Sequence, residues 1–189
     1  MNRNLTIEEH GAFRRILDAI AHPGRIQKLS DKISDLDGAA LLFSRTLLDP
    51  ETGFAVASSV RSDLASQIVR TSGCRLVDLE KADFVFVAKP GTDGALDRIR
   101  RGTPDWPDTS ATVVYLVEAL HEEGGDRSWS GPGIPGARFP KAEGLDPREW
   151  DLLSEANSTY PLGVDCFFLD EHGQIMAMPR STRMDGGTR

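Results

Sequence analysis

The stretch "YPLGVDCFFLDEHGQIMAMPRSTR", residues 160–183, decides which kind of sheet this chain can form. Two apolar runs flank an Asp-Glu-His-Gly turn, in which Gly173 can take a left-handed conformation. The pattern predicts two adjacent antiparallel strands. Pro179 has no N–H to donate to a ladder, so the second strand must end there or lie at an edge. Residues 180–183 are then expected to project from the sheet.

Upstream of this hairpin, helical and strand-like patterns alternate along the chain. The predicted helices cover residues 6–21, 39–48, 62–72, 92–101 and 146–156. The predicted strands cover residues 54–57, 74–79, 82–88 and 110–120. Because a purely parallel sheet would not close with a tight hairpin, the sequence predicts an α/β fold. We expect a mixed β-sheet flanked by helices in two or three layers.

Two of the predicted helices carry start signals. Thr6 followed by Glu9 forms a capping-box pattern at the first helix. The last helix has Asp146 in the N-cap position, Pro147 in the first turn and Glu149 where a capping glutamate would stand. These signals predict where the two helices begin.

The stretch "SGPGIPG", residues 130–136, is rich in glycine and proline. It lacks the Gly-Lys-Ser/Thr ending of a P-loop and the spacing of a dinucleotide-binding turn. Its two prolines also remove backbone N–H donors that an anion would need. The interpretation favoured by the sequence is a rigid surface loop.

Length and composition suit one α/β domain over residues 1–189, with frayed tails at 1–6 and 184–189. The net charge of −7 argues against nucleic acid as a partner, because such proteins usually carry a basic surface. No apolar run reaches the ~20 residues that span a bilayer, so no membrane association is expected. Two cysteines, Cys74 and Cys166, offer neither a disulfide framework nor a metal spacing, which fits a cytoplasmic protein.

Candidate catalytic groups are few. The four histidines form no His-Glu-x-x-His pair, so no metal site is predicted, and neither a Gly-x-Ser-x-Gly elbow nor a Ser-x-x-Lys motif is present. Lys89 stands at the end of a predicted strand, where a lysine could hold an aldehyde cofactor as a Schiff base. The usual role of a lysine at a strand exit is a solvated charge, and the alternative of a pyridoxal-phosphate enzyme stays open.

The polar cluster after the last strand is a candidate contact for an anion or a partner chain. It comprises Arg180, Ser181, Thr182 and Arg183. Guanidinium groups match phosphate and phosphonate geometry, and the two hydroxyls could add hydrogen bonds. A small-anion-binding enzyme or sensor using residues 180–183 is therefore one hypothesis for this chain.

Five segments together resemble one known family, the H subunit of bacterial carbon–phosphorus lyase, or PhnH family. They are "FRRILDAIAHPGRI" (13–26), "LLFSRTLLDPETGFAV" (41–56), "RGTPDWPDTSATVVYLV" (101–117), "SGPGI" (130–134) and "YPLGVDCFFLDEHGQIMAMPRST" (160–182). Their order and spacing cover most of the chain. The Pro-Leu-Gly-Val-Asp strand with its Pro-Arg-Ser-Thr end is the most specific of them. Tyr160 and Ser181 depart modestly from the family pattern.

The resemblance implies a fold similar to the large domain of pyridoxal-phosphate-dependent transferases, but without the cofactor. It implies a bacterial, cytoplasmic protein of organic phosphonate catabolism that joins subunits G, I and J and forms a homodimer when isolated. That complex couples a phosphonate to the ribose of ATP, forming ribose 1-methylphosphonate 5-triphosphate before the carbon–phosphorus bond is broken. No catalytic residue carries over to this chain, so the resemblance favours a non-catalytic, assembly-forming subunit.

Overall fold

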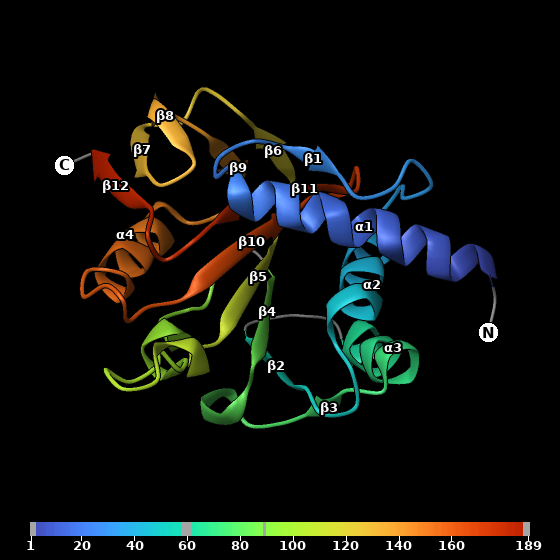
Figure 1. The fold of residues 1–189 in the computed structure, drawn as a ribbon. Helices are drawn as coiled ribbons and strands as arrows, with labels where there is room; N and C mark the ends of the chain where they lie inside the picture. Colours follow the sequence, from blue (N-terminus) through green and yellow to red (C-terminus); the bar gives the residue numbers. More distant parts are fainter. Residues whose placement is uncertain (1–2, 58–61, 89, 187–189) are drawn as a thin grey trace.

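The structure is a computed structural model of the chain, and it describes residues 3–57, 62–88 and 90–186. Figure 1 shows a central sheet with helices on both sides. The helices are α1 (Arg3–Ala21), α2 (Leu36–Leu47), α3 (Ser62–Ser72) and α4 (Pro147–Ala156). Short 3₁₀ turns lie at η1 (Leu79–Lys81), η2 (Ala95–Arg98) and η3 (Pro107–Thr109).

Seven strands form the central sheet in the order β1-β11-β10-β5-β4-β2-β3. They are β1 (Gln27–Lys28), β2 (Gly53–Ala57), β3 (Arg75–Leu76), β4 (Phe84–Ala88), β5 (Thr112–Leu116), β10 (Asp165–Leu169) and β11 (Gln174–Met178). The strands from β10 to β3 run parallel, whereas β11 and β1 are antiparallel to their neighbours. The predicted α/β fold with a mixed sheet is therefore confirmed.

The two faces of the sheet bury separate hydrophobic cores. Alternate side chains of the same strand, such as Val113 and Val114 in β5, belong to opposite cores. The core around Phe43 of α2 is covered by α1, α2 and α3. The other core contains Trp129 and Leu153, which belong to a small sheet and to α4. The strands are thus buried on both faces, as central strands of α/β proteins are.

The closing hairpin has the predicted geometry. Strands β10 and β11 pair antiparallel with Phe168 opposite Met176, and Gly173 takes a left-handed φ of 69° in the turn. An added Cβ at Gly173 would lie 2.7 Å from the Cβ of Ile33, so the glycine is also required for packing. Strand β11 ends at Met178, just before Pro179, as expected.

Several boundaries differ from the predictions. Helix α1 begins at Arg3 rather than at Thr6, and α2 begins at Leu36 because the Asp35 carboxylate caps the backbone N–H of Gly38 at 2.7 Å. The predicted strand 74–79 contributes only β3, an edge strand of two residues. The predicted helix at 92–101 is reduced to the 3₁₀ turn η2.

The prediction of a loop at residues 130–136 is wrong. Strands β7 (Arg127–Gly131) and β8 (Ile134–Arg138) form a hairpin there, in a three-stranded sheet completed by β12 (Arg183–Gly186). Gly131 and Gly133 adopt positive φ values that only glycine takes readily, and Pro135 lies in the edge strand β8, where a missing N–H is tolerated. A further small sheet pairs β6 (Ala119–His121) with β9 (Lys141–Glu143).

The tails predicted at residues 1–6 and 184–189 are described only in part. Residues 3–6 lie in α1, and residues 184–186 lie in β12, which pairs with β7. Both ends of the described chain are therefore held in regular elements.

Candidate functional site

The four residues that the sequence singles out line one cleft at the amino ends of β10 and β5. The cleft has a volume of about 880 Å³ and is bounded by residues 130–132, the last turn of α4 and residues 180–185. Strand pairing explains the meeting, because Arg183 of β12 lies opposite Ser130 of β7. The segments "SGPGI" and "PRSTR", far apart in sequence, thus face the same space.

Arg180 does not project freely from the sheet, contrary to the prediction. Its Nη2 donates to Asp165 Oδ2 at 2.6 Å, its Nε lies 3.2 Å from the same oxygen, and its backbone N–H donates to Oδ1 at 2.8 Å. Its Nη1 donates to the Pro107 carbonyl oxygen at 2.6 Å. The backbone nitrogen, Nε, Nη1 and Nη2 of Arg180 therefore all contact acceptors of the same chain, and the carboxylate of Asp165 balances the guanidinium charge.

The other three predicted residues differ in accessibility. Thr182 is buried, and its Oγ1 has no hydrogen-bond partner among the described residues, although its N–H donates to the Pro179 carbonyl at 2.8 Å. Ser181 is partly exposed, and a Cβ added at Gly131 would lie 2.9 Å from its carbonyl oxygen. Arg183 is exposed and forms no ion pair with any residue that the structure describes. Arg183 is thus the available cation of the cleft.

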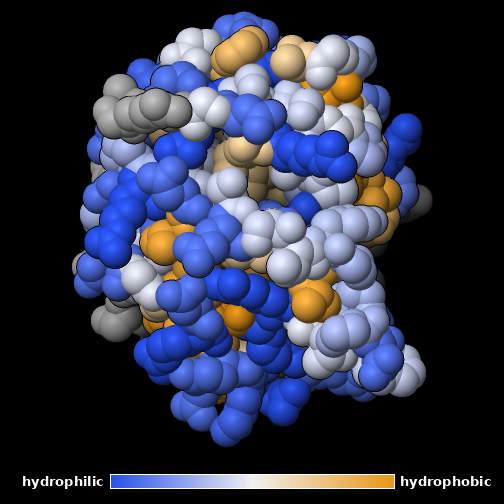
Figure 2. Space-filling model, turned by 90° about the vertical axis from the view of Figure 1, so that its left-hand side faces the viewer, coloured by the Kyte–Doolittle hydropathy of each residue, from blue (hydrophilic) through white to orange (hydrophobic). Residues whose placement is uncertain are grey.

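The cleft is rich in hydroxyl groups. Ser130, Ser154, Ser158, Tyr160 and Ser181 all line it. Figure 2 shows the side of the molecule that carries α4 and β12. The surface on this side is mostly hydrophilic, with hydrophobic residues in separate spots. Hydroxyls and one free guanidinium can bind a polar or anionic group, but the cleft brings together neither a nucleophile–base pair nor paired acids.

The sequence reasoning missed a second polar cluster, which lies beyond the carboxyl end of β4. Glu149 of α4 is only 3% exposed, and its Oε2 accepts from both the N–H and the Oγ1 of Thr92 at 3.1 Å. Its Oε1 accepts from the Tyr115 hydroxyl at 2.7 Å. Glu149 therefore does not cap its own helix as the capping-box pattern predicted, although Asp146 does, with its Oδ1 accepting from the Arg148 N–H.

This cluster is tightly packed. Gly91 has a φ of 152°, and a Cβ added there would lie 2.6 Å from Glu149 Oε2. The backbone N–H of Asp146 donates to the Pro90 carbonyl at 2.7 Å, which ties the start of α4 to the loop after β4. The only sequence signal for this arrangement is the Pro-Gly-Thr that follows the strand, and such a signal does not name a partner 57 residues away.

The pKa values of three buried groups, Tyr115, Cys166 and Cys74, are raised above their ordinary values. Burial raises the pKa of Tyr115 well above 10.0, and the charges of Cys166 and Glu149 act in the same direction. Burial likewise raises the pKa of Cys166 well above 9.0, with a further contribution from Asp165. The pKa of Cys74 is also raised by burial. Both thiols are buried and free, so they behave as small apolar side chains, as predicted for Cys166.

Neither a cluster of metal ligands nor a membrane-spanning helix occurs within residues 3–57, 62–88 and 90–186. In that part of the chain, no three histidine, cysteine or acidic side chains gather as metal ligands. Among the described helices, none is both long and apolar enough to cross a membrane. Lys89, the candidate Schiff-base lysine, lies outside the described residues.

Comparison with known proteins identifies the family. A family model described as "Bacterial phosphonate metabolism protein (PhnH)" matches residues 4–185. A protein of Stutzerimonas stutzeri described as the C-P lyase subunit HtxG is 33% identical over 179 residues, which cover 92% of this chain and 84% of that protein.

A second relative is alpha-D-ribose 1-methylphosphonate 5-triphosphate synthase subunit PhnH of Rhizobium meliloti (strain 1021). It is 28% identical over 186 residues, which cover 94% of this chain and 90% of that protein. The match therefore includes both polar clusters and the closing hairpin. This chain belongs to the PhnH family of bacterial phosphonate metabolism proteins.

Proposed function

We propose that this chain is a non-catalytic, assembly-forming subunit of a carbon–phosphorus lyase complex. The complex would form alpha-D-ribose 1-methylphosphonate 5-triphosphate from a phosphonate and ATP in organic phosphonate catabolism. The carrying observation is that the family match spans residues 4–185, and that both relatives are described as subunits of such enzymes.

The chemistry of the described residues supports a role in assembly. The two thiols and the hydroxyl of Tyr115 are buried with raised pKa values, which makes them poor nucleophiles. The Glu149 carboxylate accepts hydrogen bonds from Thr92 and Tyr115 of the same chain. By contrast, the large apolar side chains Ile7, Phe13 and Leu17 of α1 are exposed, as side chains that meet a partner would be.

We propose subunits G, I and J as the partners, a homodimer for the isolated chain, and a cytoplasmic location. Stable interfaces of this kind usually bury about 1,200–2,000 Å² or more. The exposed apolar residues of α1 would form part of such an interface, which the isolated chain could use to pair with a second copy.

Co-purification tests the assembly. The tagged chain is co-expressed with subunits G, I and J of the same organism and isolated through the tag, and all four proteins are expected in one peak on size-exclusion chromatography. The same four proteins, isolated through a tag on subunit I, serve as the reciprocal control. If G, I and J assemble normally and this chain stays apart from them, the proposal is wrong.

A separate assay tests the non-catalytic role. The assembled complex is compared with a preparation that lacks this chain, with ATP and methylphosphonate as substrates and adenine release as the readout. Product formation by the isolated chain would overturn the non-catalytic assignment. Loss of product in the absence of the chain, with none from the chain alone, is the expected result.

A second candidate function is binding of a small anion in the cleft of residues 180–185. The observation that favours it is the guanidinium of Arg183, which has no ion pair among the described residues and stands beside several hydroxyls. Arg180 contributes less than the sequence suggested, because Asp165 already matches its charge. Phosphonate or a nucleotide phosphate would suit this chemistry.

Calorimetry of the isolated chain with ATP, methylphosphonate and inorganic phosphate tests this candidate. Binding that is lost in Arg183→Ala and kept in Arg70→Ala would support anion binding in the cleft. Arg70 is a suitable control because it is an exposed arginine on α3 that does not line the cleft. No heat from any of the three compounds with the intact wild-type chain would leave the assembly function alone.

We also propose that the fold is related to the large domain of pyridoxal-phosphate-dependent transferases and that this chain uses no such cofactor. The seven-stranded mixed sheet with helices on both faces supports the first part. The second is tested by mixing the chain with pyridoxal phosphate and borohydride. A stoichiometric adduct at Lys89 in the mass spectrum would overturn it.

A further inference from the structure

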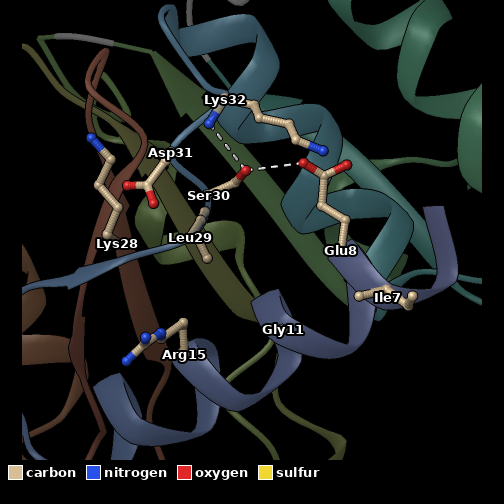
Figure 3. A pocket seen from close by; sticks show the side chains of 9 residues that line it. All are labelled: Ile7, Glu8, Gly11, Arg15, Lys28, Leu29, Ser30, Asp31 and Lys32. Carbon is tan, nitrogen blue, oxygen red and sulfur yellow. Dashed lines mark hydrogen bonds between the residues drawn. The ribbon is translucent and has the colours of Figure 1, made fainter. Parts of the chain in front are cut away.

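A hollow of about 500 Å³ lies between the first half of α1 and residues 28–32, the segment that leads from β1 towards α2. Figure 3 shows its side chains around Gly11 of the helix. On the segment side, the Ser30 hydroxyl donates to Glu8 Oε1 at 2.9 Å and accepts from the Lys32 N–H at 3.2 Å. The Ser30–Glu8 bond joins the two walls of this groove, which we call the α1 groove.

Gly11 forms the floor of the α1 groove. A glycine inside a helix costs about 1 kcal/mol relative to alanine, so its presence calls for a reason. The packing of this chain supplies none, because a Cβ at Gly11 would meet no atom within 4 Å. Ile7, Gly11 and Arg15 follow each other at intervals of four and form a row on the helix surface. A bare backbone in such a row permits close approach by another chain.

The charges of the groove stand out against the chain as a whole. Arg15, Lys28 and Lys32 line it together with the carboxylates of Glu8 and Asp31, which leaves one net positive charge. None of the three cations forms an ion pair with a residue that the structure describes. Glu8 is engaged by Ser30, and it also lies 3.6 Å from the guanidinium of Arg45. The chain as a whole carries a net charge of −7, so a groove with a small positive excess and three cations without ion pairs among the described residues favours a partner with carboxylates.

The arrangement suits a polypeptide better than a small anion. The charged ends of Arg15, Lys28 and Lys32 stand at separate places around the hollow in Figure 3 and do not converge on one point. The Lys32 N–H, one backbone donor on this wall, is already bound to Ser30. Ile7 at the end of the row is 66% exposed and offers an apolar contact that an inorganic anion would not use.

We infer that the α1 groove is the docking site for an acidic segment of another subunit of the complex. The segment lays its backbone against Gly11, places an apolar side chain on Ile7, and directs its carboxylates to Arg15, Lys28 and Lys32. This inference rests on the proposed function, because it assumes that the chain works within an assembly.

Charge reversal tests the electrostatic part. The double variant Lys28→Glu/Lys32→Glu is titrated against the assembled complex of subunits G, I and J, and its affinity is expected to fall about tenfold or more. The matched control is Arg70→Glu/Arg148→Glu, which makes the same charge change at two exposed arginines outside the groove. Lys28→Arg/Lys32→Arg keeps both positive charges and should bind like the wild type. Added salt should lower the affinity of the wild type more than that of the charge-reversed variant.

Two substitutions of Gly11 test the steric part. Gly11→Ala is expected to raise the Tm of the isolated chain, because the helix gains propensity and no contact is disturbed. Gly11→Trp should leave the circular dichroism spectrum unchanged but abolish docking, because its ring fills the groove. Equal affinity of Gly11→Trp and wild type for the complex would overturn the inference.

The outcomes separate the two proposals. If the wild-type chain does not join the complex, the proposed function fails. If it joins and the groove variants join equally well, the proposed function stands and the groove inference fails. Sedimentation of the isolated variants decides a further alternative. Loss of a homodimer in Gly11→Trp would assign the groove to a second copy of this chain, which also overturns the inference.

Discussion

Two carboxylates at opposite ends of the sheet are held in different ways. Asp165, the first residue of β10, is half-buried and forms an ion pair with Arg180. Glu149 lies beyond the other end of the parallel strands, fully buried, and its bonds come from the neutral donors of Thr92 and Tyr115. No cation among the described residues pairs with Glu149.

Asp165 and Glu149 therefore depend on their protein partners to different degrees. Water can reach the Asp165–Arg180 pair, whose side chains are 27% and 17% exposed, and can partly replace a lost contact. Water has no such access to Glu149, so its donors must all come from the protein. Removing a member of that network leaves buried polar groups without partners, and such groups cost more than an exposed pair contributes.

The largest effect is therefore expected for Glu149→Ala. It leaves the Tyr115 hydroxyl and both donors of Thr92 unsatisfied, which should lower the free energy of unfolding by about 3 kcal/mol or more. Urea unfolding followed by circular dichroism measures the loss. Glu155→Ala, an exposed glutamate of the same helix, is the control and should change little. Equal stability of the two variants would contradict the comparison.

Arg180→Ala should have an intermediate effect of about 1–2 kcal/mol. The substitution removes the bidentate contact with Asp165 and the bond to the Pro107 carbonyl, but it leaves the backbone N–H of residue 180 on Asp165. Unfolding in urea again measures the change. Arg180→Lys should recover part of the loss, because the charge remains while the fork geometry does not. A loss as large as that of Glu149→Ala would mean that the two ends are equivalent.

Tyr115→Phe tests the Glu149 network through the pH dependence of stability. The folded state raises the pKa of Tyr115 well above 10.0, so this group contributes stability below pH 10 that is lost as the pH rises further. At neutral pH the variant should lose about 1 kcal/mol, the hydrogen bond to Glu149. Above pH 10 its stability should fall less steeply than that of the wild type. Tyr160→Phe, which alters an exposed ring, controls for loss of a phenol.

Arg183→Ala should have the smallest effect on stability, within about 0.5 kcal/mol. Its side chain is exposed and forms no ion pair within the described residues, although it stands only three residues from Arg180. Thermal unfolding of Arg183→Ala beside Arg180→Ala makes the contrast within one cleft. A large loss for Arg183→Ala would show that the cleft residue has a structural role.

The elements with strong local patterns could be predicted from the sequence. The hairpin of residues 160–183, the strand at Phe84–Ala88 and the last helix with its Asp146 cap all carry signals within a few residues. The alternation of apolar residues in strands and the residues that form turns are local properties of the sequence. Elements that depend on them can therefore be predicted without knowledge of distant partners.

The features that depend on distant partners could not be predicted. The glycines and prolines of "SGPGIPG" are turn residues, so the local sequence predicts a loop. In the folded chain, β12 supplies a strand for β7 to pair with. The local sequence predicts that residues 180–183 project from the sheet, because nothing in it indicates that Asp165 lies opposite Arg180. Glu149 follows a capping pattern locally, yet Thr92 and Tyr115 take its carboxylate.

The position of β1 and β12 has a consequence for synthesis of the chain. Strand β1 lies near the beginning of the chain and pairs with β11, which lies near its end. Strand β7 pairs with β12, which is formed by some of the last residues. A nascent chain therefore reaches neither sheet's final form until nearly all of it has left the ribosome. Many native contacts join distant parts of the sequence, and chains of this kind fold slowly. Helix α1 emerges long before β11, one of the elements that it packs against, so part of its packing surface stays uncovered during that interval.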